Sequence, residues 1–205
     1  MPAQGGSTPI AGLRDRKRER NRTLTAETAW RLFIERGYDN VTVADICAAA
    51  EIAPRTFHRY FASKDDVIAE PVKEMTAIVA RHMTTAPASV SDPEVILPAM
   101  HELGAFVVEH ADWLRALSRV VDQSAHLRAT HLRVTPEREQ ELLSLRPGEP
   151  GWRRRLMFAC ATAAFRIWYE DYLRGAFPDA LSRLDEMVSL AIAGFVGAAT
   201  DDHQS

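Results

Sequence analysis

One stretch, from Thr42 to Lys64 (TVADICAAAEIAPRTFHRYFASK), constrains the fold most, because it holds three helix-start signals in close succession. Thr42 and Asp45 fit a capping box, in which the hydroxyl satisfies a free backbone N–H and the carboxylate lies near the positive end of the helix. Pro54 suits the first position of a second helix, where its missing N–H costs nothing. Ser63, followed closely by two acids, marks a third start. The stretch therefore predicts three short helices in series.

The first two of these predicted helices, about two turns each and joined by about three residues, have the arrangement of a helix-turn-helix motif, which sets its second helix into a DNA major groove. The net charge of −3 argues weakly against a nucleic-acid partner, but the distribution of charge matters more than its sum. Between Arg14 and Arg22, arginines and one lysine outnumber the two acids, Asp15 and Glu19. This basic segment suits the phosphates of DNA.

The composition predicts a globular chain. With 205 residues, 46% of them hydrophobic, the chain is long enough to bury a sizeable core in one large or two small domains. No apolar run approaches the roughly 18 residues needed to cross a bilayer, and the start of the chain lacks a signal-peptide core. We therefore expect a soluble cytoplasmic protein with no membrane partner.

The spacing of apolar residues predicts an all-α fold, because no segment shows strand alternation and no repeat of fixed period occurs. Residues 1–13, rich in Gly, Pro and Ser, are expected to form a disordered tail. Pro71 is expected to interrupt the helix that begins at Lys64. The other predicted helices cover about 14–35, 92 or 97 to 110, 112–125, 135–143, 152–174 and 179–200, with a loop over 84–93.

The N-terminal part of the chain resembles the TetR/AcrR family of transcriptional regulators. The matching residues form an ordered series between about Arg22 and Ile68, namely Leu32-Phe33, Gly37-Tyr38, Thr42-Val43, Ile46, Ala50, Thr56, Tyr60-Phe61 and Ser63-Lys64 before an acidic residue. In this family a three-helix DNA-binding domain precedes an all-helical ligand-binding and dimerisation domain. The resemblance therefore implies a helix-turn-helix domain over 14–68 and an effector-binding and dimerisation domain over 69–201.

Three residues depart from the family pattern. Glu51 stands where the family usually has glycine in the turn, and a left-handed backbone there costs another residue on the order of 1 kcal/mol. Ala53 replaces the common serine, so the second helix of the motif lacks a side-chain cap worth about 1 kcal/mol. His58 occupies the position at which a tyrosine of the family contacts phosphate, which leaves the contact of His58 open.

The candidate DNA-binding residues lie on the second helix of the motif, at helix starts and in the basic segment. Arginine bonds bidentately to a guanine edge, and threonine offers a methyl or hydroxyl group. Side chains near helix starts suit phosphate, and a basic segment adds non-specific affinity or reaches a minor groove. A single arginine is equally compatible with a solvated surface charge, so the set as a whole supports DNA contact. The predicted contacts are Arg14, Arg16, Lys17, Thr42, Arg55, Thr56, His58, Arg59, Tyr60 and Lys64.

The C-terminal region contains apolar residues that could line an effector cavity. Residues of these types more often belong to plain core, but their aromatic and methionine content indicates a hydrophobic or amphipathic ligand. This half also bears a faint similarity to acyl-CoA-responsive members of the family. The candidate lining residues are Met75, Met100, Phe106, Trp113, Met157, Phe165, Trp168, Tyr169 and Tyr172.

The last two predicted helices are expected to form a homodimer. Residues 191–199 (AIAGFVGAA) are rich in small side chains that let another helix approach closely. In the family the last two helices form a four-helix bundle across a two-fold axis. The resemblance implies a repressor whose two recognition helices address DNA half-sites, and whose effector shifts the population to a spacing that no longer fits.

The two alternatives to a DNA-binding regulator are an enzyme and a thiol-based redox sensor. The chain has no HExxH or CxxC motif and no Gly-rich phosphate loop, so we expect no enzyme activity, no metal and no cofactor. A thiol-based redox sensor would use Cys47 or Cys160. Both cysteines have the sequence context of buried structural thiols, which are inert without an electropositive neighbour.

Overall fold

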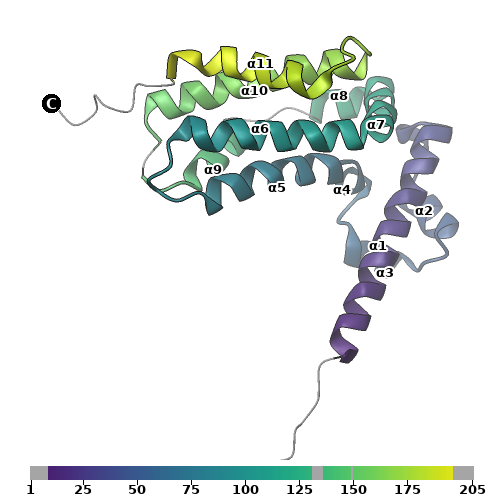
Figure 1. The fold of residues 1–205 in the computed structure, drawn as a ribbon. Helices are drawn as coiled ribbons and strands as arrows, with labels where there is room; N and C mark the ends of the chain where they lie inside the picture. Colours follow the sequence, from purple (N-terminus) through teal and green to yellow (C-terminus); the bar gives the residue numbers. More distant parts are fainter. Residues whose placement is uncertain (1–8, 131–135, 149, 196–205) are drawn as a thin grey trace, which may run out of the picture. The chain divides into compact units, whose positions relative to one another are not determined.

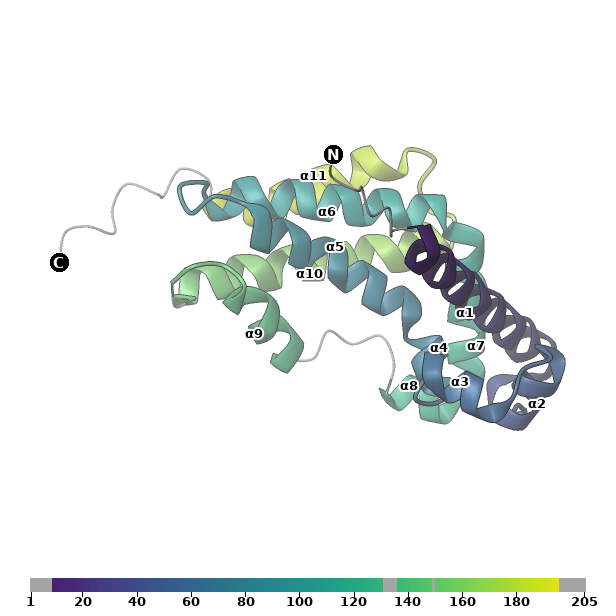
Figure 2. The same ribbon diagram turned by 90° about the horizontal axis from the view of Figure 1, so that it is seen from below.

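The computed structural model describes residues 9–130, 136–148 and 150–195 (Figures 1 and 2). No strand occurs in these ranges, and the predicted all-α fold is confirmed. Packing divides the described chain into two units, one formed by residues up to 70 with 118–130, the other by 71–117 and the residues after 135. The elements are α1 (Pro9–Arg36), η1 (Tyr38–Asn40), α2 (Val43–Ala49), α3 (Pro54–Tyr60), α4 (Lys64–Ile68), α5 (Glu70–Thr85), α6 (Asp92–Glu109), α7 (Ala111–Gln123), α8 (Ala125–Thr130), α9 (Pro136–Ser144), α10 (Trp152–Leu173), α11 (Ala180–Ile192) and η2 (Ala193–Phe195).

The core of the first unit is aromatic. Helix α1 packs against α2 and α4, and α2 packs against α3. Phe33 of α1 and Phe57 of α3 are completely buried, as is Ile46 of α2. The ring of Phe33 lies 5.1 Å from that of Tyr38, and the ring of Phe57 lies 5.7 Å from that of Phe61. Because helices this short are marginal in isolation, this buried cluster is what holds them in place.

The end of α7 and the whole of α8 also belong to the first unit. Leu127 is completely buried, and the hydroxyl of Ser124 donates a hydrogen bond to the carboxylate of Asp39 at 2.9 Å. The structure differs here from the continuous C-terminal domain over 69–201 that the sequence indicated. Contacts between residues so far apart in the chain leave no local pattern, which is why residues 118–130 were not assigned to the first unit.

The second unit is a bundle of long helices. Helices α10 and α11 lie antiparallel, and α6 packs against both (Figures 1 and 2). The buried indole of Trp168 donates a hydrogen bond to the carbonyl of Ala180 at 2.7 Å, which joins α10 to the start of α11. A methyl group at Gly104 would overlap the side chain of Leu184 and come within 3.2 Å of Leu181. Gly104 therefore allows α6 and α11 to approach closely.

The structure changes the expected start of α1. This helix begins at Pro9, so residues 9–13 are helical instead of forming part of a disordered tail. Proline is favourable at the first helical position, because its fixed φ matches the helix and its missing N–H is not needed. Residues 1–8 lie outside the described residues.

Two other helix ends can be compared with the ends expected from the sequence. Helix α4 ends at Ile68 and α5 begins at Glu70, so the chain is interrupted next to Pro71, as predicted. The last helix was expected to reach residue 200. Helix α11 ends at Ile192 and is followed by a short 3-10 turn, and residues 196–200 lie outside the described part. None of the described helices is long and apolar enough to cross a membrane.

Candidate nucleic-acid interface

A reciprocal cap starts α2, the first helix of the motif. The backbone N–H of Thr42 donates to the Asp45 carboxylate at 2.8 Å, and the backbone N–H of Asp45 donates to the Thr42 hydroxyl at 3.2 Å. The Thr42 hydroxyl also donates to the same carboxylate at 2.5 Å. These bonds, the one from the hydroxyl foremost, lower the pKa of Asp45. A phosphate contact by Thr42 requires its hydroxyl to turn away from Asp45.

The turn between α2 and α3 contains a residue with left-handed backbone, at the position where the family usually has glycine. Glu51 has a φ of +52°, and it is the single non-glycine residue with positive φ in the described chain. The backbone N–H of Ile52 then returns to the carbonyl of Cys47 at 3.0 Å, which closes the turn. Ala53 precedes α3 without any side-chain cap, as expected, while Pro54 occupies its first turn. The turn is thus held by backbone bonds and packing.

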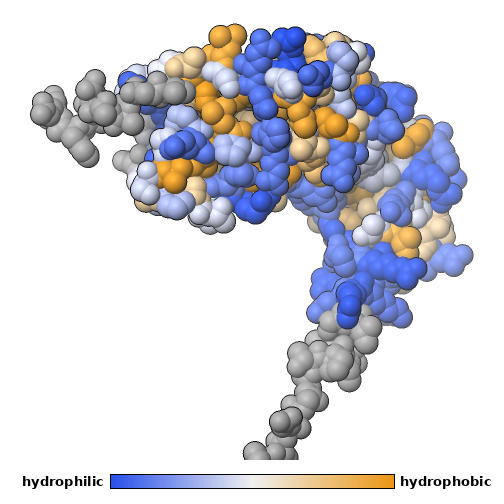
Figure 3. Space-filling model, viewed as in Figure 1, coloured by the Kyte–Doolittle hydropathy of each residue, from blue (hydrophilic) through white to orange (hydrophobic). Residues whose placement is uncertain are grey.

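Helix α3 presents a polar face and anchors an apolar one. Phe57 is completely buried, whereas Arg55, His58 and Arg59 are exposed and Thr56 is half-buried. The surface over this part of the first unit is hydrophilic in Figure 3. An exposed row of two guanidinium groups and an imidazole on a rigidly seated helix is suited to hydrogen bonding with base edges and phosphates.

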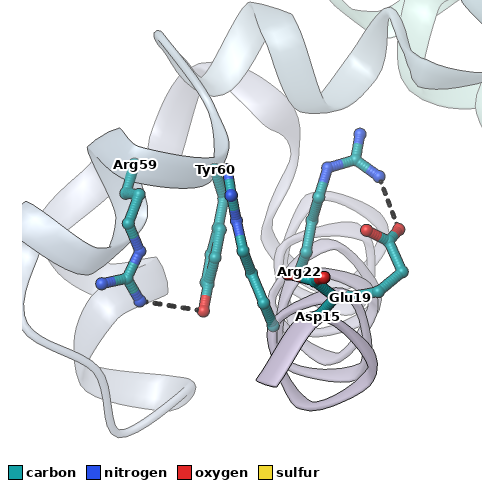
Figure 4. Close-up of a pocket in the computed structure, with 6 residues that line it drawn as sticks. Asp15, Glu19, Arg22, Arg59 and Tyr60 are labelled. Carbon is teal, nitrogen blue, oxygen red and sulfur yellow. Dashed lines mark hydrogen bonds and ion pairs between the residues drawn. The ribbon is translucent and has the colours of Figure 1, made fainter. Parts of the chain in front are cut away.

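A groove of about 330 Å³ separates the basic segment of α1 from the end of α3 (Figure 4). On the α3 side, the guanidinium of Arg59 lies 5.0 Å from the centre of the Tyr60 ring and donates to its hydroxyl at 3.1 Å. The two side chains therefore form one positively charged wall. The residues around the groove are Asp15, Arg18, Glu19, Arg22, Arg59 and Tyr60.

The α1 side of the groove combines a fixed arginine with a free one. Arg22 forms ion pairs with Glu19, at 3.2 Å, and with Glu70, and its guanidinium lies 5.1 Å from the ring of Phe61. Arg18 is exposed and has no ion pair or hydrogen bond within the described chain. Neither arginine was among the predicted DNA contacts. The charge run over 14–22 was the signal that pointed to this wall.

Lys64 has a different setting from the one expected. Its ammonium group donates to the carbonyls of Tyr38 and Val41, both at 2.9 Å, and lies 4.1 Å from the centre of the Tyr38 ring. Burial lowers the pKa of Lys64, and the charge of Asp39 partly opposes this effect. The geometry favours a structural role, in which Lys64 ties α4 to η1, over the phosphate contact indicated by the sequence.

The structure describes the side chains of only some of the predicted DNA contacts on α1. Arg16 and Lys17 are exposed on this helix, next to the groove-lining residues. Arg14 lies on the same helix, but its side chain lies outside the described part of the structure. The structure thus brings α1 and α3 together around one groove and leaves a basic stretch of α1 facing solvent.

Comparison with known proteins agrees with this geometry. The family model for bacterial regulatory proteins of the tetR family matches residues 26–70. Over 180 residues the chain is 31% identical to the HTH-type transcriptional regulator TcmR of Streptomyces glaucescens, and the match covers 80% of each protein. The chain belongs to the TetR family. It is a DNA-binding transcriptional regulator and not an enzyme.

Solved structures show the same fold. The secondary repressor NalD of Pseudomonas aeruginosa matches with a TM-score of 0.56 and 16% identity, over 86% of this chain and 95% of NalD. A TetR-like regulator from Rhodococcus sp. RHA1 matches with a TM-score of 0.50 and 20% identity, over 86% of this chain and 96% of its own. The fold of TetR-family regulators thus extends over both units.

The candidate effector residues of this TetR-family chain lie on four helices of the second unit. Met100, Met157 and Trp168 are buried as core residues are. Phe165 is buried as well, and the others are half-buried. Met75 is on α5, Met100 and Phe106 are on α6, Trp113 is on α7, and Met157, Phe165, Trp168, Tyr169 and Tyr172 are on α10.

The aromatic members of this set form a stack along α10. The rings of Trp168 and Tyr172 are parallel with centroids 5.2 Å apart, and that of Phe165 lies 5.6 Å from Trp168. Burial raises the pKa of Tyr169 to about 12, so its phenol stays protonated at neutral pH. The protonated phenol of Tyr169 provides a hydrogen-bond donor beside these aromatic rings.

The two cysteines have the surroundings of structural residues. Cys47 is buried in α2, and burial raises the pKa of its thiol, which disfavours the reactive thiolate. Cys160 is half-buried on α10 and is also a free thiol. Within the described residues, no group of three or more His, Cys, Asp or Glu side chains is arranged to hold a metal ion.

Proposed function

We propose that this TetR-family regulator is a homodimeric repressor that reads its operator with α3 and leaves it when a hydrophobic or amphipathic molecule binds the second unit. The observation that carries the proposal is the exposure of Arg55, His58 and Arg59 on a helix whose opposite face is anchored by the buried Phe57. The repressor role is taken by analogy from the fold relative NalD, which is a repressor.

The DNA contacts divide into two kinds. Arg55, near the start of α3, is the base-reading residue, because a guanidinium recognises guanine bidentately in the major groove. Thr56 and His58 adjoin it on the same helix. Arg59, Tyr60 and Arg18 line the groove and suit the phosphate backbone, together with Thr42. The basic residues Arg14, Arg16 and Lys17 of α1, of which the last two are exposed, add affinity that does not depend on sequence.

Dimerisation is supported by an apolar surface on the last two helices. Leu156 and Ile167 of α10 are exposed, as is Leu190 of α11, which has 78% of its surface exposed. Leu156, Cys160, Ala163 and Ile167 recur at intervals of four and three residues, which places them on one face of α10. Figure 3 shows hydrophobic surface over the part of the second unit where Figure 1 places α11. A second copy of the chain would bury this surface.

Effector binding is supported by the aromatic content of the second unit. The half-buried Phe106, Trp113, Tyr169 and Tyr172 can rearrange more readily than the fully buried Trp168. An apolar ligand such as an acyl chain, including that of an acyl-CoA, would pack against them. The effector needs to favour the released state by only about 1–3 kcal/mol to shift the population.

The role of α3 is tested with Arg55→Ala. Loss of a bidentate base contact is expected to weaken binding to the selected operator by about 1–3 kcal/mol, with a much smaller effect on unrelated DNA. Arg81→Ala is the matched control, since Arg81 is an exposed arginine of α5, outside the two helices proposed to form the dimer, and is expected to leave both affinities unchanged. Fluorescence anisotropy at fixed salt measures both. Equal specific binding by wild type and Arg55→Ala would remove Arg55 from base readout.

A further inference from the structure

Arg146, in the turn between α9 and α10, is a buried arginine with donors to spare. Only 5% of its surface is exposed. One terminal nitrogen donates to the carbonyl of Val90 at 2.8 Å, and Nε lies 3.1 Å from the carboxylate of Asp92 at the start of α6. The other terminal nitrogen, Nη1, is buried without a hydrogen-bond partner, and Nε is outside hydrogen-bonding geometry. Buried unpaired donors are rare because they are costly, so this one points to a missing partner.

A second arginine shares the same carboxylate. Nε of Arg154 lies 2.9 Å from one oxygen of Asp92, while Arg146 approaches the other oxygen. Within the described chain no other carboxylate pairs with either arginine, so the two guanidinium groups share Asp92. The Arg154 side chain is 18% exposed, which makes it the part of the cluster that solvent and solutes can reach.

The helix that carries Arg154 begins without the usual compensation for its positive end. Helix α10 starts after Gly151, which supplies no side-chain cap, and its first turn contains no acidic residue. Arg153 and Arg155 are exposed in that same turn. Figures 1 and 2 place the starts of α6 and α10 at one end of the second unit. Free N–H groups and positive charge at a helix N-terminus attract anions, and basic residues there are unfavourable without one.

From these features we propose that Arg146, Arg154 and the first turn of α10 bind a phosphate group, either as free phosphate or as the monoester of a larger ligand. Its several acceptor oxygens suit a donor of Arg154 and backbone N–H groups of α10, and they reach the buried spare donor of Arg146 once the cluster opens. Arginine is well matched to this geometry, since its planar fork pairs with phosphate oxygens. The bound dianion also offsets the excess positive charge of the cluster. This phosphate site does not depend on the proposed repressor function. Only an effect of phosphate on operator binding would depend on that function.

The test is isothermal titration of the full chain with inorganic phosphate, in chloride buffer at constant ionic strength and neutral pH. Wild type is expected to bind one phosphate per chain saturably, and Arg154→Ala to bind at least about tenfold more weakly, as for loss of a charge-assisted pair. Arg166→Ala is the matched control, because Arg166 is exposed on the same helix and pairs only with Glu170 within the described chain. Arg153→Gln changes an exposed residue that the fold does not need, and is expected to weaken binding about two- to threefold through lost charge.

Absence of saturable binding by wild type would overturn the proposal, and so would equal affinity of wild type, Arg154→Ala and Arg153→Gln. Phenyl phosphate, titrated in the same way, identifies the source of the phosphate. Tighter binding than inorganic phosphate indicates the headgroup of a larger ligand, and equal binding indicates the free anion; both results support the site. Operator affinity is measured on the same samples, so that loss of phosphate binding with intact operator binding separates this proposal from the function proposed above.

Discussion

The two units of this regulator position their helices by different means. In the first unit, short helices are fixed by individual polar contacts, such as the reciprocal cap of Thr42 and Asp45 and the two backbone carbonyls that receive the Lys64 ammonium. In the second unit, long helices are fixed by close apolar packing, as at Gly104 and around Trp168. The first arrangement fixes the side chains that we propose contact DNA, and the second leaves half-buried aromatic residues against which the proposed effector would pack.

The contrast predicts that removing one core ring disables the first unit alone. Phe57→Ala is expected to destabilise that unit by about 3–5 kcal/mol, because Phe57 is completely buried among helices too short to persist without it. Amide hydrogen exchange should become fast in α2–α4 and stay slow in α6, α10 and α11. Arg55→Ala, an exposed change in the same helix, is the control and should leave exchange unaltered. Simultaneous loss of protection in both units would show that they do not fold separately.

A methyl group at Gly104 probes the packing of the second unit. Gly104→Ala is expected to cost about 1–3 kcal/mol, because the new group overlaps the buried Leu184, and this outweighs the gain in helix propensity. Urea unfolding followed by circular dichroism measures the change. Ser189→Ala, at an exposed position of α11, serves as the control and should be neutral or slightly stabilising. An unchanged or increased stability of Gly104→Ala would mean that α6 and α11 have room between them.

A substitution in the turn of the helix-turn-helix motif is expected to change stability less, and to increase it. Glu51→Gly is expected to stabilise the first unit by about 1 kcal/mol, since glycine adopts the left-handed conformation without strain. Ala48→Gly, at an exposed helical position three residues earlier, should destabilise by about 0.5–1 kcal/mol. Denaturant unfolding of both variants decides the question. If Glu51→Gly behaves like Ala48→Gly, the backbone at residue 51 is not left-handed in solution.

The smallest expected effect is a pH dependence of the α2 cap. The pKa of Asp45 is lowered in the folded state, so its contribution is present above the reference value of 3.8 and is lost as pH falls through the folded value. Asp45→Asn should therefore reduce stability at neutral pH, and the gap to wild type should narrow below about pH 4. Glu27→Gln, which removes an exposed carboxylate from α1 instead, is the control. A gap that stays constant from pH 7 to pH 2.5 contradicts the role of the cap.

The same contrast explains what the sequence could predict. Thr42 and Asp45, and Ala53 and Pro54, act within a few residues, so their spacing alone predicted the helix starts and the motif. The left-handed turn at Glu51 was implied by the resemblance to the family. The docking of Ser124 and Leu127 on the first unit joins residues far apart in the chain, and no periodic pattern records it.

In the candidate site too, features set by neighbouring residues were predictable and features set by tertiary packing were not. The exposed face of α3 was predictable because a short helix with Phe57 and Phe61 in the core leaves Arg55 and Arg59 outside. The hydrogen bonds from Lys64 to two backbone carbonyls were not predictable, because a lysine at a helix start equally suits phosphate. The shared carboxylate of Arg146 and Arg154 also depends on tertiary packing, since Asp92 lies on a different helix.

The most direct test of the DNA-reading dimer is selection of bound sequences from a random double-stranded DNA pool by the wild-type chain. The expected product is an inverted repeat whose half-site centres are about one helical turn, 34–36 Å, or a multiple of it, apart. Arg55→Ala, carried through the same selection, should lose preference at one symmetric pair of positions. Failure of wild type to enrich any sequence, or enrichment of a single unrepeated site, would contradict a dimer that reads DNA through two copies of α3.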